Sequence, residues 1–303
     1  MSASGSVRPD DGGPGGVGHR RGPPGVPPPL SEMRPSLPPP PAEPTFWEFH
    51  RDRTLRFAVH LGEIAELTSR EFRSIAKRPL ELRSTLQQLD SLGVKSLGIV
   101  TVTSLFIGMV MTIQFAFSLR RFGAIEFIPR AIILSFCREL APTLTAIIVG
   151  GRIGSGMAAE VGAMNVTEQV EAIRALGADP AKKLVLPRVV AAIIVLPLLS
   201  VYALALGTVG AIFVCSLQYD IRPRLFMVSA LEVVRLGDFF GGLAKTPFFG
   251  FLIAIIGCHF GLRTTGGTEG VGLSTTRTVV AISIAILIAD FFLSKLIIIF
   301  QGA

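Results

Sequence analysis

Ionisable residues inside apolar runs are the first candidates for chemistry in this sequence. Arg138 and Glu139 stand side by side in the apolar run 131–151, and Asp290 and Lys295 stand in the run 278–300. A charge in hydrocarbon is costly unless it is paired or faces water, so such residues are kept for packing or for function. For Arg138 and Glu139 both interpretations stay open: a pair that fixes helix packing, or a polar patch that meets a headgroup in a cavity.

Asp290 also requires a partner. Lys295 lies five residues further on, too far round a helix for an i,i+4 pair, so we expect Arg138 or Arg277 to face Asp290. An alternative follows from the same residues, because intramembrane charges can also form a proton or ion relay. In that case the chain is a secondary transporter, although no internal repeat supports this.

Small residues recur at a spacing of four directly after the first of these runs. The residues in that pattern are Gly150, Gly151, Gly154, Ser155 and Ala159. Small side chains at this spacing allow two helices to approach closely. A nucleotide-binding glycine loop is excluded, because no strand precedes the run and no Gly-Lys-Ser/Thr ends it.

A short amphipathic helix is predicted over 165–177, outside the membrane. Asn165 and Glu168 are spaced as an N-cap and its N3 partner, and Gly177 ends the segment. Its polar face carries Glu168, Glu171 and Arg174. Two roles stay open: a handle for a separate ATPase subunit, or a loop helix that rests on the bilayer.

No catalytic or metal site is predicted. His259 stands alone, without an HExxH motif or an acidic cluster, so it is interpreted as a packing or hydrogen-bonding residue. The 3 cysteines, Cys137, Cys215 and Cys258, are isolated in apolar runs and have neither disulfide nor metal-site spacing. The chain is therefore not expected to be an enzyme.

Composition indicates which elements must position these residues. Of the 303 residues, 50% are hydrophobic and only 17% are charged, which excludes an ordinary soluble core. Crossing a membrane takes about 20 apolar residues. The sequence predicts an all-α integral membrane protein with transmembrane helices at about 97–119, 131–151, 189–217, 241–262 and 278–300.

The region before the first span divides into two segments. Residues 1–44 are rich in Pro and Gly and are predicted to be a disordered cytoplasmic tail. Residues 45–90 are amphipathic and basic, which favours an interfacial helix in the headgroup layer, with a soluble helical hairpin as the alternative. The net charge of +7 is attributed to basic cytoplasmic loops and not to nucleic-acid binding. Because five crossings put the two termini on opposite sides, and the N-terminal segment is cytoplasmic, the C-terminus is predicted to be periplasmic.

Several motifs follow one another in a specific order and spacing. They are Phe106-Ile107-Gly108-Met109-Val110 with Gln114, Arg138-Glu139-Leu140-Ala141-Pro142, Gly151-Arg152-x-Gly154, Ala159-Glu160-x-Gly162-x-Met164, Thr167-Glu168-Gln169, Ala178-Asp179-Pro180, Pro187-Arg188, and Thr275-Thr276-Arg277-Thr278-Val279-Val280. Together these motifs resemble the MlaE (YrbE) family, the permease subunits of MCE-type ABC transporters that move phospholipids. The resemblance covers residues from about 57 to the C-terminus.

The resemblance implies a homodimer in the bacterial inner membrane, with a separate ATPase chain and a periplasmic MCE-domain protein. The chain has no P-loop, so ATP and Mg are expected on the partner ATPase and no cofactor in this chain. The helix at 165–177 matches the family's coupling helix. The residues implied in coupling are Glu160, Met164, Thr167, Glu168, Gln169, Glu171, Arg174 and Asp179.

The same resemblance implies a lipid cavity and transport that maintains outer-membrane lipid asymmetry. The residues expected to line the cavity are Met111, Gln114, Phe115, Leu119, Phe122, Arg138 and Glu139. Met111, Phe115, Leu119 and Phe122 share one face of the first span, so they face either the substrate or a neighbouring helix. Sterols or other hydrophobic molecules stay open as alternative cargo.

Overall fold

Residues 82–302 are described by the structure, a computed structural model, and they lie within one compact unit. The expected tail 1–44 and the part of the interfacial segment before residue 82 lie outside the described residues. Residues 82–90, which we also expected in that segment, form the first turns of the first spanning helix.

The described residues are helical throughout, with short connections. The first half contains α2 (Leu82–Arg120), the 3-10 helix η1 (Ile125–Phe127), α3 (Ile128–Ser135), the π-helix η2 (Phe136–Leu144) and α4 (Thr145–Val166). The second half contains α5 (Gln169–Ala175), the π-helix η3 (Ala181–Val185), α6 (Leu186–Gln218), α7 (Pro223–Val233), α8 (Leu236–Leu262) and α9 (Gly267–Gly302).

The predicted set of five membrane-spanning helices is confirmed for the described residues. The helical stretches long and apolar enough to cross a membrane are Leu82–Arg120, Ile125–Val166, Ala181–Gln218, Leu236–Leu262 and Gly267–Phe300. Each is longer than the apolar run that predicted it, because helix geometry continues into the polar ends. The short helix α7 was not predicted from the sequence.

The π-helix η2 lies where the sequence places a proline inside a spanning helix. In a regular α-helix the ring of Pro142 would press on the carbonyl of Arg138 and leave that carbonyl without its N–H partner. Wider π turns relieve this conflict and are frequent at functional sites. The motif that contains Arg138 and Glu139 is therefore an irregular turn within a continuous span.

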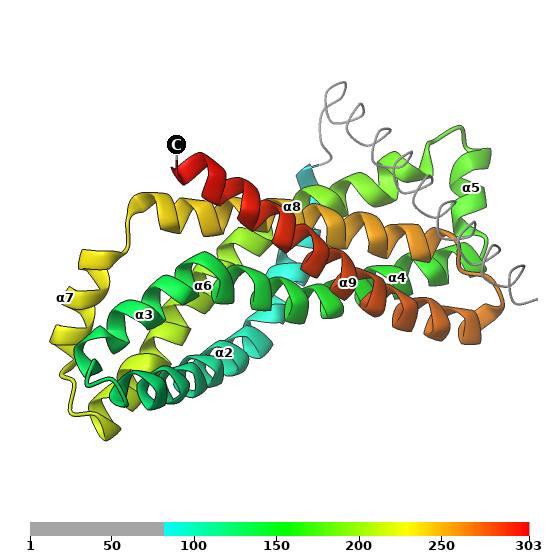
Figure 1. The fold of residues 1–303 in the computed structure, drawn as a ribbon. Helices are drawn as coiled ribbons and strands as arrows, with labels where there is room; N and C mark the ends of the chain where they lie inside the picture. Colours follow the sequence, from blue (N-terminus) through cyan, green and yellow to red (C-terminus); the bar gives the residue numbers. More distant parts are fainter. Residues whose placement is uncertain (1–81, 303) are drawn as a thin grey trace, which may run out of the picture. The chain divides into compact units, whose positions relative to one another are not determined.

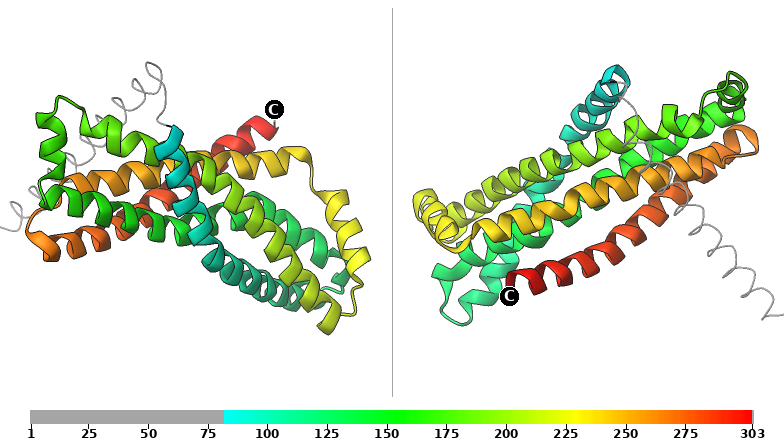
Figure 2. Two further views of the ribbon diagram at one scale, coloured as in Figure 1. Left: turned by 180° about the vertical axis from the view of Figure 1, so that it is seen from behind. Right: turned by 90° about the horizontal axis from the view of Figure 1, so that it is seen from above.

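Long helices lie side by side in the described unit (Figures 1 and 2). α2 packs along α6, while α4 packs along both α8 and α9, and α8 also contacts α6. α5 lies beyond the end of α4, as a short helix that takes no part in this packing of long helices (Figure 1). Side chains from several helices therefore meet in the interior between the spans.

Two clusters of buried apolar residues hold these helices together. The first core joins α4, α6, α8 and α9 and includes Val149, Ile153, Met157, Val195, Leu196, Phe249, Ile253, Ile282 and Ile286. The second core joins α2, α3, α6 and α7 and includes Ala116, Ile128, Ile132, Phe136, Ala211, Cys215 and Phe226. Many large apolar side chains outside these cores are exposed, as expected for helices that face lipid.

Candidate functional site

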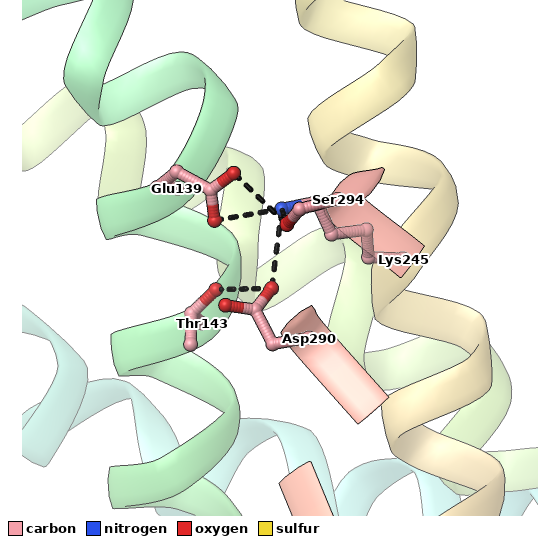
Figure 3. A network of polar contacts seen from close by, with 5 residues as sticks. All are labelled: Glu139, Thr143, Lys245, Asp290 and Ser294. Atoms are coloured by element: carbon pink, nitrogen blue, oxygen red, sulfur yellow. Dashed lines mark hydrogen bonds and ion pairs between the residues drawn. The ribbon is translucent and has the colours of Figure 1, made fainter. Parts of the chain in front are cut away.

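Lys245 is a buried cation inside α8, with only 2% of its side chain exposed. Its ammonium nitrogen donates to Glu139 Oε2 at 2.8 Å and to Asp290 Oδ1 at 3.1 Å. It also donates to Ser294 Oγ at 2.7 Å. An ammonium group has three donors, so this single cluster satisfies all of them (Figure 3).

Two hydroxyl groups complete the cluster around the carboxylates. Thr143 Oγ1 donates to Asp290 Oδ1 at 3.0 Å, and Ser294 Oγ donates to Glu139 Oε1 at 3.0 Å. We call the 5 residues Glu139, Thr143, Lys245, Asp290 and Ser294 the charge network (Figure 3). Because they come from η2, α8 and α9, the charge network joins three helical segments across the span.

Arg138 does not pair with its neighbour Glu139. Its Nε and Nη2 donate to Asp238 Oδ1 at 2.8 and 2.6 Å. The other carboxylate oxygen of Asp238 accepts the N–H of Arg235 at 3.1 Å and so caps the start of α8. Asp238 and Lys245 lie two turns apart on α8, so the adjacent residues Arg138 and Glu139 both bind one face of that helix.

The expected partner of Asp290 was wrong. We expected Arg138 or Arg277, whereas Lys245 and a threonine of η2 bind its carboxylate. Lys245 lies inside the span predicted at 241–262, but it precedes the apolar stretch 247–262 and was not considered as a partner. The spanning helix α8 begins at Leu236, so Lys245 lies well within it. Lys295 is exposed and takes no part in the charge network.

The apolar face predicted on span one packs mainly inside the chain. Met111, Phe115 and Leu119 are partly buried against the second core. Gln114 is exposed, and Phe122 lies beyond the end of α2 with 83% of its surface exposed. Met111, Phe115 and Leu119 therefore face a neighbouring helix, as one of the two interpretations predicted. Gln114 and Phe122 are exposed.

The short helix α5 is anchored by one apolar side chain and exposes its charges. Val170 is 1% exposed, whereas Glu168, Glu171 and Arg174 all lie on the surface. Glu168 adopts a left-handed conformation with φ 61° just before the helix. Gly177 has φ +76° after it, and its N–H bonds to the carbonyl of Arg174, as in a Schellman cap. Tight turns at both ends thus hold α5 out from the spans.

The predicted capping pair of Asn165 and Glu168 was wrong. α4 continues to Val166, so Asn165 lies in its last turn and not at the start of α5. The amide of Asn165 donates to the carbonyl oxygen of Thr264 at 3.0 Å. Asn165 therefore links the end of α4 to the segment after α8, and the residue before α5 has no side-chain cap.

Glu160 connects two spans instead of facing outward freely. Arg188 Nη2 donates to Glu160 Oε2 at 2.7 Å, and Arg188 Nη1 donates to the carbonyl oxygen of Leu184 at 2.6 Å. Arg188 is buried, while the side chain of Glu160 is 59% exposed. The ion pair fixes the end of α4 to the start of α6, on either side of α5.

The other residues implied in coupling act locally or are partly covered. Gln169 Nε2 donates to Thr167 Oγ1 at 3.1 Å. Asp179 Oδ1 accepts the N–H of Ala181 at 3.0 Å and so caps the start of η3. Met164 is partly buried in the last part of α4. These contacts shape the loops around α5.

The small residues of α4 face two different surroundings. Gly150 and Gly154 lie against α8 and α9, where an added Cβ on Gly154 would overlap an isoleucine of α9. Gly151 faces α9 at an ordinary distance. Ser155 and Ala159 instead line an open groove between α4 and α2. Of the predicted small residues, Gly150 and Gly154 thus allow close helix approach, whereas Ser155 and Ala159 face the groove.

Within residues 82–302, no group of three or more His, Cys, Asp or Glu side chains is placed to hold a metal ion. His259 is buried, with its ring edge-on to Phe260.

Comparisons with known proteins place the chain in a family. The family model described as Permease MlaE matches residues 85–296. A probable ABC transporter permease of Synechocystis is 45% identical over 78% of this chain and 89% of its own length. The chloroplastic protein trigalactosyldiacylglycerol 1 of Arabidopsis thaliana is 43% identical over 76% of this chain and 65% of its own length. A probable ABC transporter permease of Rickettsia typhi is 38% identical over 80% and 94%. The chain therefore belongs to the MlaE family of ABC transporter permeases.

Proposed function

We propose that this chain is the permease subunit of a transporter that moves phospholipids between the inner and outer membranes of a bacterium and so maintains outer-membrane lipid asymmetry. It works as a homodimer in the inner membrane, beneath a periplasmic MCE-domain protein. ATP and Mg bind to a separate ATPase chain, and this chain hydrolyses nothing. The Arabidopsis relative is named after a glycerolipid, which supports a lipid cargo.

The observation that carries this proposal is the placement of α5. This helix buries Val170, partly covers Ile173, and presents Glu168, Glu171 and Arg174 to the surroundings. Leu176, at its end, is an apolar side chain with 85% of its surface exposed. Exposed charges around an apolar anchor are typical of a docking surface for another protein.

α5 is connected to the charge network through α4. α5 directly follows α4, which packs along α8 and α9, the two helices that carry Lys245 and Asp290. The Glu160–Arg188 ion pair keeps α4 and α6 together at that end. When the partner ATPases close on ATP, they draw the two α5 helices together, and the rigid helices reshape a lipid cavity between the subunits.

Reconstitution of the complete complex tests the proposal. The full chain, its ATPase and its MCE protein are placed in donor vesicles, and transfer of a fluorescent phospholipid to acceptor vesicles is followed with and without ATP. Glu168→Lys combined with Glu171→Lys should abolish co-purification of the ATPase and reduce ATP-dependent transfer to the ATP-free level, because the charge of the docking surface is reversed. Glu126→Lys, on η1 at the other end of span two, is the matched control.

Two results would overturn the proposal. ATPase binding that survives the double charge reversal would remove the docking role of α5. Lipid transfer that needs no ATP and follows a proton gradient would instead favour a secondary transporter that uses the intramembrane charges.

A further inference from the structure

An open groove of about 500 Å³ lies between the first turns of α2 and the middle of α4. Polar side chains make up much of its lining. They include Gln88, Ser91 and Lys95 of α2, Arg152 and Ser155 of α4, and Thr275 of α9. The groove contains no residue of the charge network or of α5, although Glu160, one of the residues implied in coupling, lines it.

The groove contains two cations that no carboxylate of residues 82–302 neutralises. Lys95 Nζ has one hydrogen bond, to Ser91 Oγ at 3.2 Å, and Arg152 Nη1 donates to Ser96 Oγ at 2.8 Å. Among the described residues, no carboxylate forms a salt bridge with Lys95 or Arg152. An ammonium has three donors and a guanidinium has five, so most of the donors of these two lining residues have no partner among residues 82–302.

A carboxylate among the lining residues does not reduce the positive charge of the groove. Glu160 also lines it, but its Oε2 already accepts from Arg188 at 2.7 Å. Glu160 and Arg188 therefore cancel each other's charge. The remaining lining has a net charge of two positives, from Lys95 and Arg152, and an anion is the ligand that this lining fits.

Both cations are expected at the depth of lipid headgroups, from their places at the ends of the apolar runs. Lys95 is the last charged residue before the uncharged run 97–119, and Arg152 directly follows the apolar run 131–151. The two spans run in opposite directions, so these positions mark the same membrane boundary. Cations at this boundary interact with the phosphates of the adjacent leaflet.

An apolar track leads from the groove into the membrane. The groove-lining residues of α2 follow helical spacing, from Gln88 through Ser91 to Lys95. The same stripe continues to Ile99, Val102 and Phe106, all of which are exposed. A molecule with its anionic group between the cations could extend acyl chains along this track, which a free phosphate ion could not use.

We propose that this groove binds the phosphate of an anionic phospholipid, with Arg152 and Lys95 donating to its non-bridging oxygens and the Ser91 hydroxyl adding a further contact. A guanidinium binds phosphate through paired N–H donors, and the ammonium acts as a compact charge beside it. The proposal concerns binding, so it holds whether the bound lipid is cargo or a permanent component of the permease.

Lipid retention by the purified full chain tests the site without ATP or an ATPase. The protein is equilibrated with micelles that contain equal amounts of phosphatidylglycerol and phosphatidylcholine, and retained lipid is identified by native mass spectrometry. The wild type should retain mainly phosphatidylglycerol. Lys95→Gln and Arg152→Gln should each lower this retention about tenfold, because each removes charged hydrogen bonds to the phosphate. Lys182→Gln with Lys183→Gln removes exposed charge outside the groove and should have no effect.

A second variant blocks the groove without changing its charge. An added Cβ on Gly156 meets nothing within 4 Å, so Gly156→Leu leaves the helix packing intact while its side chain fills the groove. It should lower retention of phosphatidylglycerol as much as Arg152→Gln does. Ala205→Leu adds the same side chain at an exposed position of α6 and is the control.

The lipid proposal fails if wild type and Arg152→Gln retain the same lipids, or if Gly156→Leu has no effect. It also fails if millimolar inorganic phosphate displaces the retained lipid, since the site would then recognise free phosphate. Retention of phosphatidylglycerol in the presence of phosphate supports the lipid as the ligand.

Discussion

At the scale of single residues, the charge network shows how a lysine is kept inside a membrane span. An unpaired cation at the centre of a bilayer costs roughly 3 kcal/mol or more. Lys245 avoids this cost because Glu139, Asp290 and Ser294 accept all three of its hydrogen bonds. The same contacts join η2, α8 and α9, so the polar cluster also fixes how these segments pack.

Removing Lys245 alone should lower the free energy of unfolding more than removing all the charges of the charge network together. Lys245→Met leaves two carboxylates in the span without their counterion, and we expect the free energy of unfolding to fall by about 3 kcal/mol. This is a modest value for a buried pair, because 46% of the Glu139 side chain is exposed. Thermal and denaturant unfolding in detergent would measure the loss. Lys295→Met, at an exposed position, should change little.

A combined variant separates charge from packing. Lys245→Met with Glu139→Gln and Asp290→Asn contains no unpaired charge, so it should recover part of the lost stability. If Lys245→Met alone is as stable as the wild type, the three hydrogen bonds do not stabilise the span.

Part of this site was predictable from residue type alone. Glu139 and Asp290 attract attention because they are ionisable residues inside long apolar runs. Lys245 and Asp238 do not, because they precede the longest apolar stretch of their helix. Pairing across helices depends on the rotation and depth of each helix, which the spacing of residues within one span does not determine.

At the scale of helices, glycines set the distance between α2 and α6. A Cβ on Gly108 would overlap the carbonyl oxygen of Gly207, and a Cβ on Gly210 would overlap the carbonyl oxygen of Leu105. The two backbones are therefore in direct contact, as small residues allow in membrane helices. Van der Waals packing at such contacts is the main attraction between spans, since lipid is as apolar as their side chains.

Gly108→Ala should force α2 away from α6. We expect it to lower the free energy of unfolding by about 1–3 kcal/mol, the usual cost of adding a methyl group to a packed contact. Gly98→Ala is a matched control on the same helix, because its Cβ would meet nothing within 4 Å. The control should be neutral or stabilising by up to about 1 kcal/mol, since alanine favours helix. Equal stabilities of both variants, measured by unfolding in detergent, would contradict close packing at Gly108.

Sequence patterns predicted the spans better than their contacts. Long uncharged runs identified each crossing, because the length of a membrane helix is set by the bilayer. The α2–α6 contact was missed since the glycines of α2, Gly93, Gly98 and Gly108, do not recur at a spacing of four. Asn165 was interpreted as a cap from local spacing, but α4 continues past it and its amide binds the backbone near α8 instead.

At the scale of the whole molecule, the spans differ in how much of their surface the chain itself covers. The most apolar window of α9 is 11% buried and that of α2 is 28% buried, compared with 44–56% for the other spans. Lipid or a second subunit must cover these faces. The proposed homodimer would use one of them, and the sequence could not indicate which, because exposed and dimer-facing positions are equally apolar.

Cross-linking tests α9 as the dimer contact. In a two-fold dimer only residues near the axis meet their own copies, and a disulfide needs Cβ atoms about 4 Å apart. Cysteines placed singly at the exposed positions Val280, Ile284 and Ile288 should therefore link most of the protein into covalent dimers at one helical face. The native cysteines are buried, so they should form little cross-linked product of their own. Val209→Cys, equally exposed on α6, should stay monomeric. Linking at Val209 but not on α9 would move the interface to another helix, and a monomeric mass in mild detergent with no linking anywhere would contradict the homodimer.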